Sequence, residues 1–445
     1  MPNVFARTGA NERRLIGASF LANVGIEAAY FVGFLGYLAY GFNAGPALMA
    51  TVMFVLNFSH VLGDASSGVF IDRMGPRRTT FLFNATLVVL CVAGQWCGTN
   101  IYAYSVFAGL VGYCMSIIKT ALGSFAPYLE RDRTGLKRIN TLVTIGGFTA
   151  TIVGPFAAGL ITRYFPTMRL FVFTAGAVAA AALITLAVRE RYRPDRGGDA
   201  SDGGRTERRH PVREAVEGAR FVFQHQSLRY YLVVGVMMWF AFGAFDALES
   251  LYYRDVLQVG ISWMGWMNTI TGVGLVLGSV VLARANTRWV NARSLVAMLL
   301  LEGLGTVLYV GTHSVWWAAC GSFVLGVAFG INEPMMRTLI QVDSPLEKAG
   351  RTLGTIQTFR IALTLLPLVV APTLAKWTSP QAVLVAAGFL TVLFAVVLVR
   401  SSYRIDRRKA AGRKISQVDP FADPDDINPR ERASSTEDAH LLFEE

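Results

Sequence analysis

The chain has 445 residues, of which 53% are hydrophobic and only 16% are charged. Soluble domains average about 25% charged residues, so this composition, with a mean hydropathy of +0.43, excludes an ordinary soluble globular protein. The formal net charge of +11 suggests nucleic-acid binding, a function that the distribution of the basic residues argues against.

About twelve apolar runs of roughly 20 residues follow one another along the chain, and each is long enough to span a bilayer. Only α-helices satisfy the backbone hydrogen bonds over such runs, and the alternating pattern of a β-barrel is missing. The predicted fold is therefore an all-α membrane protein with twelve transmembrane helices, near residues 15–40, 46–70, 79–97, 101–125, 141–162, 169–188, 228–252, 263–283, 294–312, 315–338, 353–375 and 381–400.

Lysine and arginine lie almost entirely on one side of the predicted spans. With the N-terminus placed in the cytoplasm, 34 of the 41 basic residues fall in the inner segments and 4 in the outer loops. Three more, Lys119, Arg337 and Arg360, lie within or near apolar runs. This asymmetry follows the positive-inside rule. We therefore expect a multi-pass protein of the cytoplasmic membrane with both termini inside, membrane lipids around it and no nucleic-acid partner.

We expect the first apolar run to be a span rather than a cleavable signal peptide, because it is long and lacks a small-residue cleavage site. The four cysteines lie in or at the ends of apolar runs, without metal-ligand spacing. We interpret them as packing residues. No metal and no cofactor are expected.

The chain divides into four parts. Residues 1–188 and 228–400 each hold six predicted spans. The polar, basic segment 189–227 links them and contains a predicted amphipathic helix over residues 212–224, suited to the inner membrane surface. Residues 401–445 turn polar and acid-rich, which predicts a disordered cytoplasmic tail.

The two six-span parts repeat each other. With an offset of 218, Lys119 aligns with Arg337 and Pro127 with Pro345; with an offset of 217, Pro155 aligns with Pro372. Several such matches in order indicate duplication, so we expect two pseudo-symmetric six-helix bundles. Transporters built in this way bind substrate between their halves.

A basic turn after the second apolar run is the most informative segment. Gly68 offers close helix contact, Asp72 at a membrane boundary needs a partner, and Gly75 ends the helix. The segment resembles the loop between helices 2 and 3 of the major facilitator superfamily, G-x-x-x-D-R-x-G-R-R, although Pro76 replaces its first arginine. That resemblance implies the major facilitator fold and a cytoplasmic gate formed by Gly68, Asp72, Arg73, Gly75, Arg77 and Arg78.

A second motif lies in the fifth span. Pro155 removes one helix hydrogen bond and kinks the span, while Gly154 and Gly159 allow close contact with a partner helix. The sequence around them is similar to the G-x-x-x-G-P-x-x-G-G signature of antiporters in the superfamily, with Ala150 and Ala158 in place of two glycines. Ordinary small-residue packing is the alternative interpretation.

Carboxyl groups inside apolar spans are the first functional candidates, because a charge at mid-membrane costs at least ~2.5 kcal/mol. Glu27 lies in the middle of the first span and shares a helix face with Asn23 and Tyr30. Asp246, its approximate repeat equivalent, shares a face with Glu249 in the seventh span. We predict that Glu27, Asp246 and Glu333 couple protons to transport. The alternatives are a structural ion pair for Glu27 and a solvated outer position for Glu249.

Basic and polar residues supply further candidates for a substrate cavity. Lys119 and Arg337 either bind an acidic substrate group, pair with Glu27, or reach the inner headgroups. For Arg337, an intrahelical pair with Glu333 is a further alternative. Asn57 and His60 share a face of the second span, where His60 either titrates or packs through hydrogen bonds. Trp239 belongs to an aromatic group in the seventh span that suits a bulky lipophilic substrate or lipid packing.

Glycines and flanking residues in 256–278 also resemble the seventh and eighth helices of macrolide and siderophore exporters. The sequence contains no Walker motif, which argues against an ATP-driven pump. We expect a secondary transporter, not an enzyme. It is expected to act as a monomer and to export lipophilic cationic or zwitterionic small molecules in exchange for protons. Alternatives are an exporter or flippase of anionic amphiphiles such as siderophores or lysolipids, and a transporter-like receptor or scaffold.

Overall fold

The computed structural model describes residues 9–97, 100–130, 133–190, 192, 220–344 and 349–416. Within these ranges the regular secondary structure is helical, and twelve helices are long and apolar enough to cross a membrane. They occupy the twelve predicted positions, because each apolar run can satisfy its backbone polar groups only within itself. The predicted fold class is confirmed.

The first six spans begin and end where the local sequence dictates. Pro46 and Pro76 take the first helical positions, where a missing N–H costs nothing. Gly75 ends the second span with φ +80°, a conformation that favours glycine. The spans are α1 (Ala10–Ala28) with η2 (Ala29–Gly41), α2 (Pro46–Met74), α3 (Pro76–Ala93) with η3 (Gly94–Trp96), α4 (Ile101–Gly123), α6 (Arg133–Tyr164) and α7 (Arg169–Leu186), with the short α5 (Ala126–Leu129) before α6.

The second six spans follow the same plan. Asn291 caps the ninth span by accepting the backbone N–H of Ser294. Prolines lie inside two of these helices, as Pro155 does in α6. The spans are α9 (Gln226–Leu251) with η4 (Tyr252–Val256), α10 (Ser262–Arg284), α11 (Ala292–Val310), α12 (Val315–Asp343), α13 (Ala349–Trp377) and α14 (Pro380–Ser416), with the short η5 (Thr287–Trp289) before α11.

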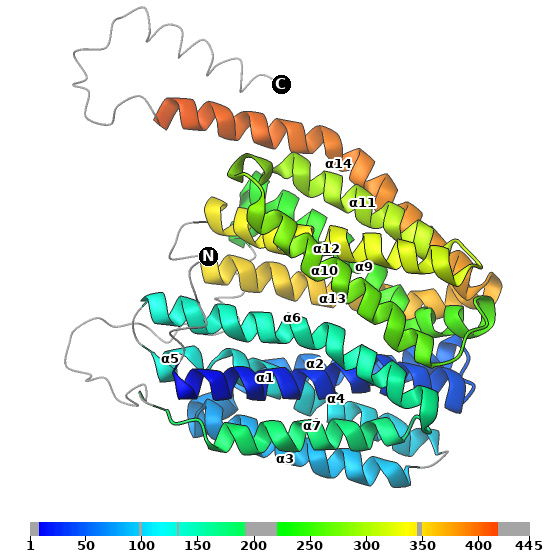
Figure 1. The fold of residues 1–445 in the computed structure, drawn as a ribbon. Coiled ribbons are helices and arrows are strands. Elements are labelled where there is room, and N and C mark those ends of the chain that lie inside the picture. The colour runs from blue at the N-terminus through cyan, green and yellow to red at the C-terminus, as the bar shows by residue number, and fades with distance from the viewer. Residues whose placement is uncertain are drawn as a thin grey trace, which may run out of the picture.

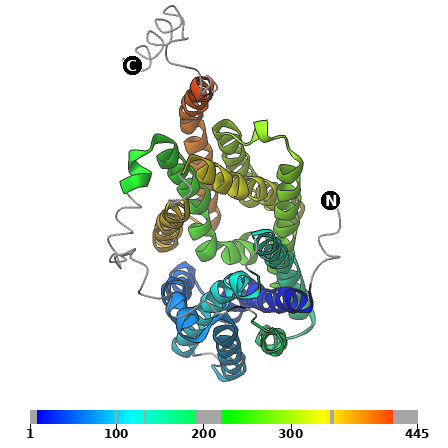
Figure 2. The ribbon, with the colours of Figure 1, turned by 90° about the vertical axis from the view of Figure 1, so that its left-hand side faces the viewer.

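The helices form two bundles that lie side by side. Figure 1 shows α1 to α7 below and α9 to α14 above, and the view turned by 90° in Figure 2 keeps the two groups apart. The start of α1 and the end of α14 lie at the same end of the molecule, on the left in Figure 1. We call this the terminal end, and the opposite end, where η2 and η4 finish, the far end.

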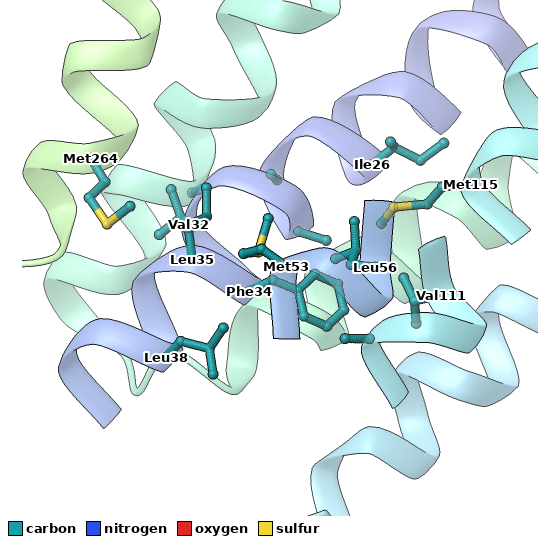
Figure 3. Packing of buried hydrophobic residues seen from close by; sticks show 14 of the residues in the cluster. Ile26, Val32, Phe34, Leu35, Leu38, Met53, Leu56, Val111, Met115 and Met264 are labelled. Atoms are coloured by element: carbon teal, nitrogen blue, oxygen red, sulfur yellow. The ribbon is translucent and has the colours of Figure 1, made fainter. Parts of the chain in front are cut away.

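Large apolar side chains fill the first bundle and reach into the second. Phe34 of η2, Met53 and Leu56 of α2, and Val111 of α4 are buried together, and Met264 of α10 joins the same cluster (Figure 3). Close helix packing depends on glycine where backbones meet. A Cβ on Gly112 of α4 would lie 2.6 Å from the Leu56 carbonyl oxygen, so only glycine fits without a shift.

The boundary predicted at residue 400 needs correction, because α14 continues to Ser416. Residues 401–416 are rich in arginine, lysine and alanine, which favour helix. Asp406 also anchors this extension, since its carboxylate accepts the backbone N–H groups of Ala292 and Arg293 at 3.0 and 3.1 Å and so caps α11. The remainder of the predicted tail lies outside the described residues.

The linker is described only at its edges. Residues 193–219, which include most of the predicted amphipathic helix, lie outside the described residues. Residues 220–224 are helical, with Val222 buried and the Phe223 ring 5.6 Å from that of Phe359. The last turn of the predicted helix therefore packs against the second bundle.

Candidate functional site

A cavity of about 260 Å³ lies between the two bundles, and carboxyl groups from three helices line it. They are Glu27 of α1, Asp246 and Glu249 of α9, and Glu302 of α11. Within the part of the chain that the structure describes, the lining contains no lysine, arginine or histidine. Its other members are mostly apolar or aromatic, including Phe31, Trp239, Phe242, Phe245, Tyr309 and Phe329. We call this space the carboxyl cavity.

A neighbouring cavity of about 380 Å³ shares Phe31, Trp239, Phe242 and Asp246 with it. This second space, the mixed cavity, adds both acidic and basic groups. Its further polar lining residues are Tyr30, Asn57, His60, Asp64, Ser116, Lys119 and Thr364. The structure thus brings most of the predicted cavity residues to two adjoining spaces.

Asp246 joins the two bundles through hydrogen bonds. Its Oδ2 atom lies 3.0 Å from the Tyr30 hydroxyl and accepts a bond of 3.3 Å from the Asn57 side-chain amide. The same hydroxyl lies 3.2 Å from Asn57 Oδ1, and with one proton it donates to one of these acceptors at a time. Asp246 has no lysine or arginine within ion-pair distance in the described part of the chain.

Glu27 is held differently, by a cation from a neighbouring helix. Its Oε1 atom lies 2.8 Å from Lys119 Nζ of α4. Gly154 allows α6 to approach α1 closely beside Glu27, because a Cβ at this position would lie 2.7 Å from the Val24 carbonyl oxygen and 3.0 Å from Glu27 Cβ. The alternative considered from the sequence, pairing of Lys119 with Glu27, is the arrangement found.

The antiporter-like motif also contacts the second bundle. A Cβ on Gly159 would lie 2.5 Å from the Trp266 ring, and one on Gly265 of α10 would lie 2.2 Å from the Pro155 carbonyl oxygen. The close contacts predicted for Gly154 and Gly159 are therefore present, with α1 and α10 as the partner helices.

Glu249 is enclosed rather than solvated. Its Oε1 atom accepts hydrogen bonds from Tyr253 at 3.0 Å and Tyr309 at 2.5 Å. The alternative of a solvated outer position is wrong, because these two tyrosines cover the carboxyl group. Neither tyrosine was predicted from the sequence, although Tyr253 was detectable because it lies one helical turn after Glu249.

Glu302 is 2% exposed and accepts a 3.4 Å bond from the Asn332 amide. It lines the carboxyl cavity from α11.

Glu333 pairs mainly with a residue that the sequence analysis did not select. Its Oε2 atom lies 2.7 Å from Arg360 Nη1, whereas its Oε1 atom lies 3.7 Å from Arg337 Nη2. The Arg360 guanidinium also lies over the Trp239 ring, 4.6 Å from its centroid. Arg360 could have been selected from the sequence because it is a single arginine within an apolar run. Neither Glu333 nor Arg337 lines the two cavities.

Asn23 and His60 depart from simple cavity roles. Asn23 bonds back to the Ser19 carbonyl oxygen at 2.8 Å and lines neither cavity. The His60 ring stacks on that of Tyr30, with centroids 6.2 Å apart, and its buried Nε2 atom has no hydrogen-bond partner within the described ranges. The nearby Asp64 accepts bonds from Ser116 and Thr120 of α4.

The predicted gate segment is built within the first bundle. The Arg77 guanidinium donates to the Leu186 carbonyl oxygen, and the Arg77 backbone N–H donates to Glu190 at 3.2 Å. Arg78 lines the same cavity as Leu186 at the end of α7. Asp72 and Arg73 are exposed at the terminal end. A Cβ on Gly68 would meet nothing within 4 Å, so the close contact expected there is not made.

The bundles are joined at the far end by reciprocal bonds. The Tyr40 hydroxyl donates to the Val259 carbonyl oxygen at 2.7 Å. In the other direction, Arg254 Nη1 donates to the carbonyl oxygens of Ala39 and Ala44 at 2.7 and 3.1 Å. Each half thus holds the end of the other half's first span.

Comparison with known proteins places these features in a family. The sequence profile of the Major Facilitator Superfamily matches residues 15–366. The Multidrug resistance protein MdtG of Escherichia fergusonii is 26% identical over 356 residues, covering 78% of this chain and 81% of the relative. MdtG of Salmonella typhimurium is 25% identical over 405 residues, covering 89% and 94%.

Solved transporter structures share the fold. The nucleoside transporter NupG superimposes with a TM-score of 0.68 at 12% identity, covering 88% of this chain and 99% of its own. A POT family transporter in complex with a thioalcohol-conjugated peptide gives 0.69 at 11% identity, covering 90% and 98%. At such identities the likeness concerns the fold alone.

Proposed function

Because this chain belongs to the Major Facilitator Superfamily, we propose that it is a secondary active transporter that exports lipophilic, positively charged small molecules in exchange for protons. It is a multi-pass membrane protein with twelve spans. Its MdtG relatives are named multidrug resistance proteins, which supports efflux of drug-like molecules as the proposed function.

One observation carries the proposal: among the described residues, four carboxyl groups and no basic residue line the carboxyl cavity. Aromatic rings fill much of the remaining lining, and a lipophilic cation is attracted both to such rings and to carboxylates. Lys119 pairs with Glu27, but the other three groups have no ion-pair partner among the described residues and cannot all be charged at low cost in a space of about 260 Å³ between helices. A proton or a substrate cation would relieve this repulsion, so the two ligands compete.

Asp246 is the proposed site of that competition. It lines both cavities and connects α9 to η2 and α2 through Tyr30 and Asn57. A substrate cation that approaches the carboxylate displaces its proton, and a proton arriving from the other side displaces the cation. Because the same bonds link the two bundles, a change in the charge of Asp246 also changes how strongly the halves are held together.

Glu27 has a supporting role in this proposal. Lys119 neutralises it, but the lysine side chain is 43% exposed and the glutamate only 12%. The lysine can therefore leave for water while the glutamate turns to a substrate cation.

The orientation belongs to the same proposal. The basic residues gather at the terminal end, which the positive-inside rule assigns to the cytoplasm. Export then begins from the terminal end and finishes at the far end, where Tyr40 and Arg254 must release their partners.

An anionic amphiphile is the second candidate substrate. Lys119 lines the mixed cavity and Arg337 is 63% exposed on α12, so both are accessible to a negatively charged group. This candidate requires transport of lysolipids or siderophores to depend on Lys119 and Arg337 more than on Asp246.

Flux measurements in proteoliposomes with an imposed pH gradient test the proposal. The wild type should move a lipophilic cation such as ethidium against its gradient, and Asp246→Asn should lose most of this flux. Ser250→Ala is the control, because Ser250 lies on the same helix as Asp246 and lines neither cavity. Cation flux that ignores the pH gradient in the wild type would contradict the proposal.

A further inference from the structure

A third cavity, of about 920 Å³, lies outside the transport site, at the terminal end between the start of α3 and the end of α7. All of its lining residues belong to the first bundle or to the segment directly after α7. Three of them are arginines, namely Arg77, Arg78 and Arg189. The others include the apolar residues Phe81, Leu82 and Leu186.

The charges in this space are not balanced. Among the described residues, Glu190 is the only acidic one in the lining, and its carboxylate already accepts the backbone N–H of Arg77 in the first turn of α3. Arg78 and Arg189 are exposed, and their guanidinium groups have no ion-pair partner within the described ranges. The first turn of α3 adds partial positive charge from its N–H groups.

The position of Arg189 is fixed through its backbone. Its N–H donates to Asn11 Oδ1 at 3.3 Å, and its carbonyl oxygen accepts from Asn11 Nδ2 at 3.1 Å. These bonds hold the Arg189 backbone against the start of α1, and its exposed side chain lines the same cavity as the first turn of α3.

An apolar surface continues from the arginines toward the middle of the spans. Leu82 and Val89 of α3 are 47% and 66% exposed and lie two helical turns apart on one face. Leu183 and Leu186 of α7 are 67% and 40% exposed. Because α3 and α7 pack together, the basic cavity and these side chains form one surface that is polar at the membrane edge and apolar inside.

We propose that this surface binds an anionic glycerophospholipid. Its phosphate lies between Arg78 and Arg189, and its acyl chains lie along the exposed leucine and valine side chains of α3 and α7. Basic pockets between spans favour anionic headgroups in this way. The excess of positive charge favours an anionic lipid over a zwitterionic one. The exposed apolar side chains of α3 and α7 can bury acyl chains, so a lipid should bind more tightly than a free phosphate ion.

Lipid titration of the purified full-length chain, followed by native mass spectrometry, tests this site. Phosphatidylglycerol should bind more tightly than phosphatidylcholine with the same acyl chains. Arg78→Gln with Arg189→Gln should weaken phosphatidylglycerol binding roughly 30-fold and leave phosphatidylcholine binding unchanged. Arg78→Lys with Arg189→Lys keeps both charges and should retain most of the preference, which guards against loss of folding in the glutamine variant.

The matched control is Arg284→Gln with Arg288→Gln, which removes two exposed charges beside η5 at the same end of the molecule. It should change the phosphatidylglycerol affinity by no more than about twofold. An equal loss in both double variants would show that net charge alone attracts the lipid and would overturn the site. Displacement of the lipid by millimolar inorganic phosphate would overturn it as well, since the occupant would then be a free anion.

Discussion

The carboxyl groups of the cavity differ in what balances their charge. Lys119 Nζ lies 2.8 Å from Glu27, so that carboxylate has a full positive charge beside it. In the described ranges, Asp246 and Glu249 receive hydrogen bonds from neutral groups, namely Tyr30 and Asn57 for the first and two tyrosines for the second. A bonded but unneutralised carboxylate has most to gain from a proton or a substrate cation, which is why the coupling role is proposed for Asp246.

The Glu27–Lys119 pair predicts a non-additive result at the residue scale. Glu27→Gln leaves Lys119 without its partner, and Lys119→Gln leaves a carboxylate that is 12% exposed without its cation. Each change should lower the free energy of unfolding, by about 1 kcal/mol or more for the loss of the lysine. The double variant Glu27→Gln with Lys119→Gln should cost less than the sum, as measured by thermal or denaturant unfolding in detergent. Additive losses would show that the two residues do not interact.

Helix α6 connects the two bundles at the level of elements. Gly154 faces α1, while the Pro155 carbonyl oxygen and Gly159 face α10 of the other bundle. Pro155 cannot donate a backbone hydrogen bond, which loosens the helix at the same place. The helix can therefore bend where it touches both halves, as alternating access requires of an element at the bundle interface.

Substitution of two glycines on α6 tests this reading. Gly154→Ala should lower stability by about 1–3 kcal/mol and reduce transport, because its Cβ would lie 2.7 Å from a backbone oxygen of α1. Gly147→Ala on the same helix is the control, since a Cβ there meets nothing within 4 Å. Thermal unfolding and flux can be followed for both. If the two variants behave alike, the close approach of α1 and α6 is not what Gly154 provides.

At the scale of the whole molecule, the two halves hold each other at the far end through equivalent positions. Tyr40 near the end of the first span reaches Val259, and Arg254 near the end of the seventh span reaches Ala39 and Ala44. The arginine bonds are charge-assisted and are therefore the stronger of the two sets. Opening of the far end must break both sets together.

Loss of the arginine should therefore favour a structure that is open at the far end. Arg254→Gln should shift the population by roughly tenfold or more, and Tyr40→Phe by less. Spin labels on cysteines placed at Tyr102 and Trp377, two exposed residues at the far ends of α4 and α13, report the separation. The four native cysteines need replacement first. An unchanged distance distribution in Arg254→Gln would mean that other contacts keep this end closed.

The sequence predicted what depends on local pattern and composition. Twelve spans and the close contacts at Gly154 and Gly159 follow from apolar run length and small-residue spacing. The ion-pair partners of the charged residues were harder to predict from the sequence, because tertiary packing decides which side chains meet. Lys119 lies 92 residues from Glu27, and nothing local to Glu333 indicates that Arg360 rather than Arg337 is its nearer partner. The helical extension to Ser416 was missed because hydropathy reports burial in lipid, not helix length.

Proton release on substrate binding is the most direct test of competition in the carboxyl cavity. The full-length chain in a weakly buffered detergent solution is mixed with a lipophilic cation such as tetraphenylphosphonium, and the bulk pH and the bound cation are measured together. The account predicts that binding releases protons from the wild type at some pH between about 5 and 8, and that Asp246→Asn releases fewer. Cation binding without proton release over this whole range, or equal release from Asp246→Asn, would contradict it.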